Sequence, residues 1–268
     1  MGVFYESIPP SLESWILEQK VLWVATAPLT ASGHVNLSPK GGPYFGIVNP
    51  TTFWYLDLTG SGSETLSHLH EPGNGRITVL FNAFEGPPRI VRLWGWGEVL
   101  EYGTQKYLDF VKQTSADTIP GTRAVIVVHI HQVGSSCGFS MPLFDFKDFR
   151  STLNEFFEKR VAAEEAGNKK DGIERYWAYK NAFSIDGLPG MQRGLETGQK
   201  ENVKPLKKMV GPRAPKANML HYPSSVHSRP ALSMVLFLLA MVLSFGAGIF
   251  TTVFAPLYTA RLLESVPK

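Results

Sequence analysis

The sequence predicts a mainly β fold, a closed or partly closed antiparallel barrel with peripheral helices, followed by one C-terminal transmembrane helix. Seven β-rich segments, separated by turn residues, occur within roughly 115 residues, a spacing typical of a barrel. Segments with helical spacing interrupt these strands and follow them. Near the C-terminus, 31 consecutive residues carry no charge, which is enough apolar chain to cross a bilayer as a helix.

The first element is a short helix, and the strands come after it. Ser11 follows two prolines and is suited to cap a helix in which Leu12, Trp15, Ile16 and Gln19 have helical spacing. The pattern then changes to β-branched and aromatic residues bounded by glycine, proline and asparagine turns. The predicted strands cover residues 21–29, 34–38, 45–48, 53–58, 76–84, 89–100 and 124–133.

The remaining elements are helical. Their spacing predicts helices over residues 63–70, 104–113, 146–166 and 173–183. The longest of them carries an apolar stripe that we interpret as facing the core, formed by Phe149, Leu153, Phe156, Phe157 and Val161. A turn over residues 186–190 ends the helical pattern.

Four regions follow from these patterns. We expect one domain over residues 1–190, a basic flexible linker over 191–230, a transmembrane helix over 231–256 and a short tail over 257–268. Residues 1–199 carry a formal charge of −4, whereas residues 200–230 carry +6. Because basic residues flank the cytosolic side of a span, we expect a single-pass membrane protein with its N-terminal domain in the cytosol, and the endoplasmic reticulum is favoured.

Composition excludes several classes of protein. With 44% hydrophobic and 18% charged residues, the chain is not a disordered one. The single cysteine, Cys137, permits no internal disulfide and no cysteine-rich zinc site. His129 and His131 share one face of a strand, but no third ligand has suitable spacing, so we expect no metal site. The local basic segment does not indicate a nucleic-acid-binding domain.

Two segments carry the residues suited to bind an anion. Residues 33–41 read Gly-His-Val-Asn-Leu-Ser-Pro-Lys-Gly, and residues 58–65 read Leu-Thr-Gly-Ser-Gly-Ser-Glu-Thr. Small residues let backbone N–H groups converge on an anion, and Lys40 supplies a full positive charge. We interpret the pair as a phosphate cradle. For the second segment alone, a flexible connection in which Ser63 caps a helix is the favoured interpretation.

An ordered set of short motifs resembles a known family. These motifs are residues 24–27 (Val-Ala-Thr-Ala), 37–41 (Leu-Ser-Pro-Lys-Gly), 62–65 (Gly-Ser-Glu-Thr), 75–78 (Gly-Arg-Ile-Thr), 89–95 (Arg-Ile-Val-Arg-Leu-Trp-Gly), 136–140 (Ser-Cys-Gly-Phe-Ser) and 184–190 (Ser-Ile-Asp-Gly-Leu-Pro-Gly). Over residues 3–190, the chain resembles the pyridoxamine 5′-phosphate oxidase-like FMN-binding split barrels, in particular their fungal and bacterial flavoprotein branch.

The resemblance implies a six-stranded split barrel that pairs into a homodimer and holds FMN at the subunit interface. It places Asn36 and Ser38 near the flavin ring. The cofactor-binding residues that it implies are Asn36, Ser38, Lys40, Ser63, Thr65 and Arg92.

The phosphate side of this implied site departs from the family pattern. The resemblance puts Ser63 and Thr65 at the phosphate, with Lys40 or Arg92 as the cation. True pyridoxamine-phosphate oxidases carry Ser-Arg-Lys at the turn that reads Ser-Glu-Thr here, so Glu64 replaces a base with an acid beside the phosphate.

The resemblance implies an FMN-dependent oxidoreductase that oxidises or reduces a small molecule by two electrons, with a nicotinamide cofactor, oxygen or a quinone as the other partner. No side chain identifies itself as an acid or base catalyst. The alternative is a non-catalytic flavin- or ligand-binding scaffold of the same fold, and a deazaflavin or haem would also suit such a barrel. Trp94 and Trp96 are interpreted as core residues, although an indole of this pair can also stack on a flavin.

Overall fold

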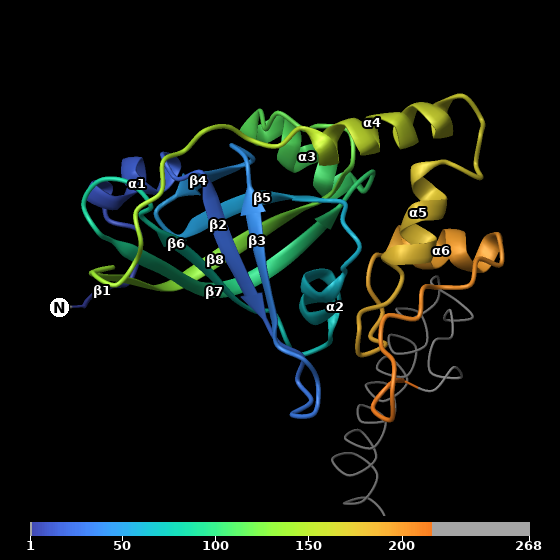
Figure 1. Cartoon of the computed structure of the whole chain (residues 1–268), viewed down its shortest axis with the longest axis horizontal. Coiled ribbons are helices and arrows are strands. Elements are labelled where there is room, and N and C mark those ends of the chain that lie inside the picture. Colours follow the sequence, from blue (N-terminus) through green and yellow to red (C-terminus); the bar gives the residue numbers. More distant parts are fainter. Residues whose placement is uncertain (1, 216–268) are drawn as a thin grey trace, which may run out of the picture. The chain divides into compact units, whose positions relative to one another are not determined.

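The strands of the computed structural model form one curled antiparallel sheet (Figure 1). The structure describes residues 2–215, which lie in one compact unit of the chain, Met1–Tyr222. The strand order is β3-β2-β6-β7-β8-β5-β4, with β1 added to β8. The strands are β1 (Val3–Tyr5), β2 (Val21–Thr26), β3 (Asn36–Gly41), β4 (Phe45–Asn49), β5 (Thr52–Leu58), β6 (Arg76–Asn82), β7 (Ile90–Glu101) and β8 (Thr122–Ser136).

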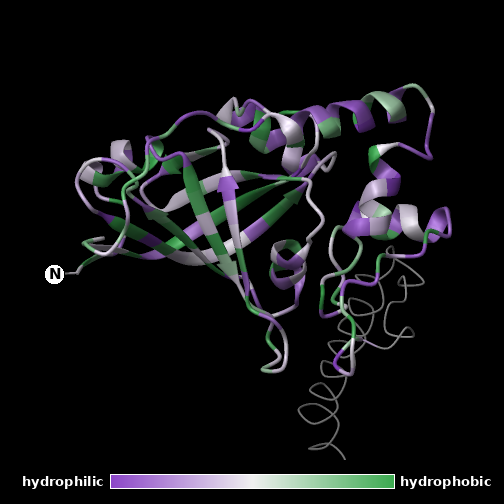
Figure 2. Ribbon diagram, in the orientation of Figure 1, coloured by the Kyte–Doolittle hydropathy of each residue, from purple (hydrophilic) through white to green (hydrophobic). Residues whose placement is uncertain are grey.

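Alternating side chains explain why these segments are strands. In β2, Leu22 and Val24 are buried inside the curl, while their neighbours are only half-buried. Figure 2 shows hydrophobic residues concentrated along the strands. In the centre of the curl, three rings pack with centroids 5.7 to 5.9 Å apart: Phe45, Phe53 and Phe81. This apolar core stabilises the sheet through burial rather than through any local preference.

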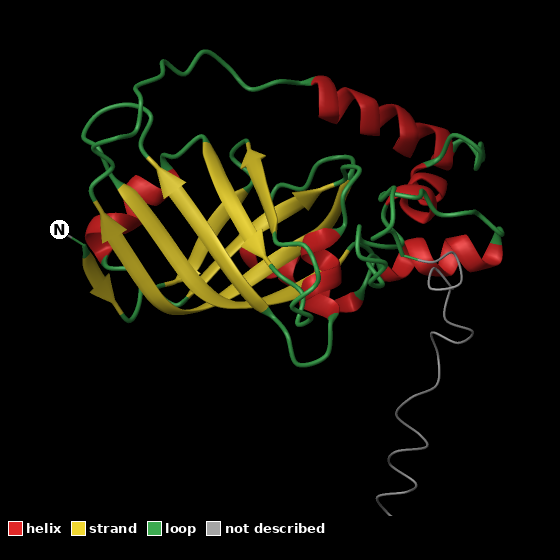
Figure 3. Cartoon of the chain, turned by 60° about the horizontal axis from the view of Figure 1, so that its bottom comes forward, coloured by secondary structure: helices red, strands yellow, loops and turns green. Residues whose placement is uncertain are grey.

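The sheet is a half-barrel, because no pairing joins its two end strands, β3 and β4, in the described residues. Figure 3 shows the curled sheet with helices along its margins. The mainly β prediction and all seven predicted strands are confirmed. The structure has eight strands, two more than the resemblance implies. The strand absent from the predictions, β1, has only three residues, which are too few to show an alternating pattern.

The helices are α1 (Pro10–Leu17), α2 (Glu64–His70), α3 (Gln105–Thr114), α4 (Thr152–Glu165), α5 (Ile173–Lys180) and α6 (Gln192–Lys200). Helix α1 buries Leu12 and Ile16 in the core of the barrel, as their spacing predicts. Helix α4 begins six residues later than the predicted start at residue 146. Its predicted core stripe is wrong at three positions, since only Phe157 is fully buried; the exposed members are Phe149, Leu153 and Phe156.

Residues 192–200 form α6, where the sequence predicts a flexible linker. The carboxylate of Glu101 accepts hydrogen bonds from the backbone N–H of Gln192 at 2.8 Å and of Arg193 at 3.3 Å, so it caps the helix from another element. Gly194 lets α6 approach α5 closely, because a Cβ there would lie 2.8 Å from the carbonyl oxygen of Trp177. The glycine content of this segment suggests a flexible linker, but in the structure Gly194 allows two helices to pack closely.

The membrane prediction requires a correction. In the range 2–215, no helix has the length and apolar character needed to cross a membrane. The predicted fold class included such a helix, and the predicted localisation in a membrane, with the endoplasmic reticulum favoured, depended on it. The described fold is a half-barrel with peripheral helices and contains no membrane helix. The predicted span over 231–256 and the tail over 257–268 lie outside the described residues.

Candidate functional site

A polar cavity of about 330 Å³ lies between β3, the end of β5 and the start of α2. This size is within the range of about 300–1,000 Å³ that small-molecule sites occupy. The cavity is lined by Asn36, Ser38, Pro39, Lys40, Gly41, Leu56, Leu58, Thr59, Gly60, Gly62, Glu64, Thr65, Arg123 and Leu153. The two segments that the sequence predicts as a phosphate cradle therefore face the same space.

The pleat of β3 sends its polar side chains to the cavity. Asn36, Ser38 and Lys40 are two residues apart, so they share one face of the strand and are each half-buried. Leu37 points the other way and is 64% exposed. This alternation is maintained by the pairing of β3 with β2, in which Asn36 lies opposite Thr26.

Two cations surround one buried carboxylate at the wall of the cavity. Asp57 on β5 is fully buried, and its two oxygens lie 2.7 Å from Lys40 Nζ and 2.7 Å from Arg123 Nε. Burial alone would raise the pKa of Asp57, but the charges of Arg123 and Lys40 outweigh it and lower that pKa to about 2. The carboxylate is therefore ionised at neutral pH, and the three groups together carry one excess positive charge.

The turn between β5 and α2 is held from outside the turn itself. Asn181 donates hydrogen bonds to the carbonyl oxygens of Gly60 at 2.9 Å and Gly62 at 3.1 Å. Trp177 Nε1 donates to Thr59 Oγ1 at 2.9 Å. No atom lies within 4 Å of a Cβ built on Gly60, so this glycine borders open space. The turn is thus rigidly anchored on one side and open towards the cavity on the other.

A chain of polar side chains continues from the cavity into the fold. Ser38 Oγ donates to Asn36 Oδ1 at 3.0 Å, and Asn36 Nδ2 donates to Thr65 Oγ1 at 3.1 Å. Behind them, Thr26 Oγ1 lies 2.9 Å from Nδ1 of the buried His68. Burial is the main cause that lowers the pKa of His68, so its ring is neutral at neutral pH. The chain fixes the orientation of the Asn36 amide.

The structure brings four of the six predicted residues together and separates two. Asn36, Ser38, Lys40 and Thr65 line the cavity. Ser63 is fully buried behind the turn, where its hydroxyl donates to the carbonyl oxygen of Phe183 at 2.8 Å. Arg92 lies near the start of β7, paired with β6 and β8, and is not among the residues that line the cavity.

Arg123, and not Arg92, is the arginine that lines the cavity. It lies at the start of β8 and reaches the cavity wall through Asp57 on the neighbouring strand. A signal was present in the sequence: Asp57 is the one acid in the apolar strand 52–58, and Arg123 is the one base beside the apolar run 124–128. A single charge in an apolar strand indicates a buried group that needs a partner, since an unpaired charge would not be buried, but it does not identify that partner.

The outward face of the sheet carries a second, shallower cavity of about 360 Å³. Trp94 and Trp96 both line it, together with Thr26 and His131. Trp96 is 51% exposed, so its interpretation as a core residue is wrong. His129 and His131 are both exposed, and no group of three or more His, Cys, Asp or Glu residues suited to a metal occurs in the described range.

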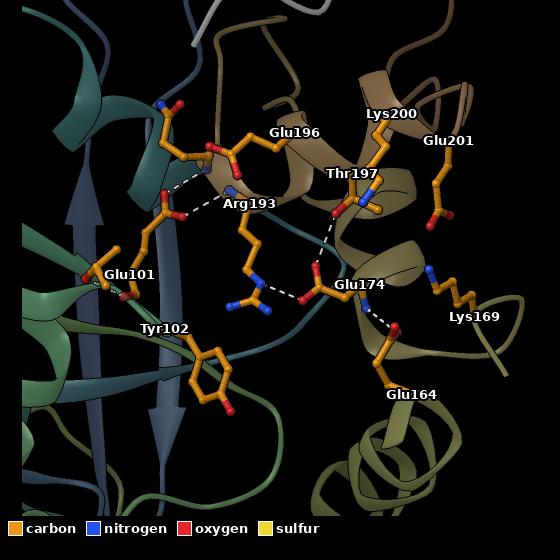
Figure 4. Close-up of a pocket in the computed structure, with 13 residues that line it drawn as sticks. Glu101, Tyr102, Glu164, Lys169, Glu174, Arg193, Glu196, Thr197, Lys200 and Glu201 are labelled. Carbon is orange, nitrogen blue, oxygen red and sulfur yellow. Dashed lines mark hydrogen bonds and ion pairs between the residues drawn. The ribbon is translucent and has the colours of Figure 1, made fainter. Parts of the chain in front are cut away.

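A third cavity, of about 490 Å³, lies beside α6 and is rich in charge (Figure 4). Two of its carboxylates bind groups of α6. Glu101 holds the first N–H groups of α6, and Glu174 binds Arg193 Nε and Thr197 Oγ1. We interpret this network as the attachment of α6 to the rest of the fold and not as a site for chemistry.

An open antiparallel half-barrel, with a polar cavity between β3, β5 and α2, has the architecture of a split barrel. The chain is 37% identical over 209 residues to "Pyridoxamine 5'-phosphate oxidase family protein ustO" from Aspergillus flavus, a match that covers 73% of this chain and 80% of that protein. The chain therefore belongs to the pyridoxamine 5′-phosphate oxidase family. No family model matches it.

Solved structures give weaker matches. HupZ from group A Streptococcus is 23% identical, with a TM-score of 0.36, over 47% of this chain and 91% of that chain. The FAD-binding protein from Mycobacterium smegmatis is 10% identical, with a TM-score of 0.33, over 49% of this chain and 97% of that one.

Proposed function

We propose that this chain is an FMN-dependent oxidoreductase that binds the cofactor phosphate between Lys40 and Arg123. The observation that carries the proposal is the pair of cations around the single buried carboxylate of Asp57, at the wall of an open polar cavity. Family membership supports a flavin as the ligand.

The residues present fit a phosphate. The excess positive charge of the Lys40, Asp57 and Arg123 cluster complements a dianion, and the lysine ammonium has two N–H donors besides the one it gives to Asp57. The Thr65 hydroxyl, which accepts from Asn36, keeps its own proton and adds a neutral donor on the same cavity wall. Open space beside Gly60 leaves room for the phosphate and its ribityl chain.

The same cavity suits the polar edge of the flavin ring. Asn36 presents an amide whose orientation is fixed by Ser38 and Thr65, so it is suited to hydrogen bond to a ring that also has donors and acceptors on one edge. When bound, the flavin supplies the two-electron chemistry, while these side chains bind and orient it. A small molecule is the substrate or electron donor, and a nicotinamide cofactor, oxygen or a quinone is the other partner.

We place the second subunit of a homodimer on the outward face of the sheet, beside the cavity of Trp94 and Trp96. Trp96, Val35 and Leu37 expose apolar surface on or next to this face, and β3 connects it to the polar cavity. A cofactor held near β3 would then touch both subunits.

The test is the absorption spectrum of the purified full-length chain, with mass identification of any ligand released on denaturation and a titration with added FMN. The proposal expects an oxidised-flavin spectrum or saturable FMN binding, and weaker binding by Lys40→Ala. Lys112→Ala, which removes an exposed lysine on α3, is the matched control. A colourless protein that does not bind added FMN would favour the non-catalytic scaffold. A haem or deazaflavin spectrum would show that this group, and not FMN, is the cofactor.

A further inference from the structure

The chain returns to the candidate site after α6. Leu206 N donates to the carbonyl oxygen of Tyr179 at 2.7 Å, and Val203 is buried. Two residues later, Lys208 Nζ donates to Ser63 Oγ at 3.2 Å and lies 3.5 Å from Glu64 Oε1. We call residues 201–208 the C-terminal strap. The strap inserts one lysine, only 11% exposed, behind the turn that borders the cavity.

The partner of this lysine is the residue that departs from the family pattern. Glu64 lines the cavity, and an unpaired carboxylate there would repel a bound phosphate. Its Oε1 accepts a hydrogen bond from Ile185 N at 3.1 Å and also faces Lys208. Both contacts draw the carboxylate towards the back of the turn.

We propose that Lys208 is a positioning residue for the phosphate site: by pairing with Glu64, it cancels the negative charge beside the phosphate and holds that carboxylate away from it. This inference rests on the proposed FMN function. A cation from the strap, 145 residues away in sequence, thus restores the charge that the Ser-Glu-Thr turn lacks.

The surroundings of Lys208 support a charged pair. Burial is the main cause that lowers the pKa of Lys208 to about 8; Glu64 opposes this shift, and Arg123 and Lys180 contribute to it. The lysine is therefore mostly protonated at neutral pH. The hydroxyl proton of Ser63 is used on Phe183, so the oxygen of Ser63 is left to accept from the ammonium.

The test compares two probes, FMN and riboflavin, which differ by the phosphate alone. Their affinities for the full-length chain are measured by quenching of flavin fluorescence. Lys208→Met is expected to weaken FMN about tenfold and to leave riboflavin within twofold. Lys208→Arg is expected to keep FMN affinity. Lys207→Met, which removes the exposed neighbouring lysine, is the matched control.

A compensating change separates charge from structure. Adding Glu64→Gln to Lys208→Met is expected to restore FMN affinity, because the acid that needs neutralising is gone. If Lys208→Met does not fold, Glu64→Gln alone tests the inference. Because it removes the negative charge beside the phosphate, it is expected to raise the affinity for FMN relative to that for riboflavin.

The inference is overturned if Lys208→Met binds FMN like the wild type, if it loses both probes equally without rescue, or if Glu64→Gln leaves the ratio of affinities unchanged. A wild-type chain that binds neither probe overturns the proposed function, and this inference with it.

Discussion

Replacing Asp57 by Asn tests whether the buried ion cluster stabilises the fold. The substitution keeps the shape of the side chain but leaves Arg123, whose side chain is 5% exposed, without its counter-charge. Removing one partner of a buried ion pair costs about 3–5 kcal/mol, because the remaining charge is left unpaired. Lys40 is 21% exposed and can turn to solvent, so we expect a loss near the lower limit, about 3 kcal/mol.

The pKa of Asp57 gives an independent magnitude. Lowering this pKa from 3.8 to about 2 corresponds to about 2 kcal/mol at neutral pH. Because the folded-state pKa is the lower one, this contribution is present above pH 3.8 and is lost as the pH falls through about 2. The wild-type chain should therefore lose stability across this window, and Asp57→Asn should lack that part of the loss.

Urea denaturation at pH 7, repeated at several values between pH 5 and 2.5, measures both effects. For a domain of this size, a loss of about 3 kcal/mol also lowers Tm by roughly 6–12 °C. Asp117→Asn, at an exposed position, is the control. A free energy of unfolding within about 0.5 kcal/mol of wild type at pH 7, or an unchanged pH dependence, would refute the reasoning.

Three further changes probe polar side chains of the fold and the site. Thr59→Val leaves the buried N–H of Trp177 without an acceptor and should lower the free energy of unfolding by about 1–3 kcal/mol in urea; an unchanged midpoint contradicts this. Glu101→Gln removes the charge at the N–H of Gln192 and should speed amide hydrogen exchange in α6, at a cost of about 1 kcal/mol; equal exchange would show that the cap is not needed. Lys40→Met should weaken FMN about tenfold and riboflavin little; an unchanged ratio would remove Lys40 from the phosphate site.

Local patterns in the sequence determined the elements of the barrel and half of its candidate site. Alternation along residues 21–26 and 76–82 predicts strands because one face of each must be buried. The same period places Asn36 and Ser38 on one face of β3, and the small residues before Thr65 bring the start of α2 to them. Lys40 shares this face because the strand continues to Gly41, beyond its predicted end at residue 38. The residues involved are close together in sequence, so local composition and spacing are enough to predict how they are arranged.

Only the tertiary structure decided which charges meet. Asp57 and Arg123 are 66 residues apart, and Lys208 reaches Ser63 from 145 residues away. Nothing in the periodicity of either segment records its partner, since an ion pair depends on the strand order and on the path of the chain after α6. The same holds for α6, whose first turn is capped by Glu101, 91 residues earlier. The sequence by itself determined where strands and polar faces form. The fold decided which cation neutralises which acid. A buried charge needs a partner of opposite sign, and only the strand order and the path of the chain bring residues so distant in sequence together.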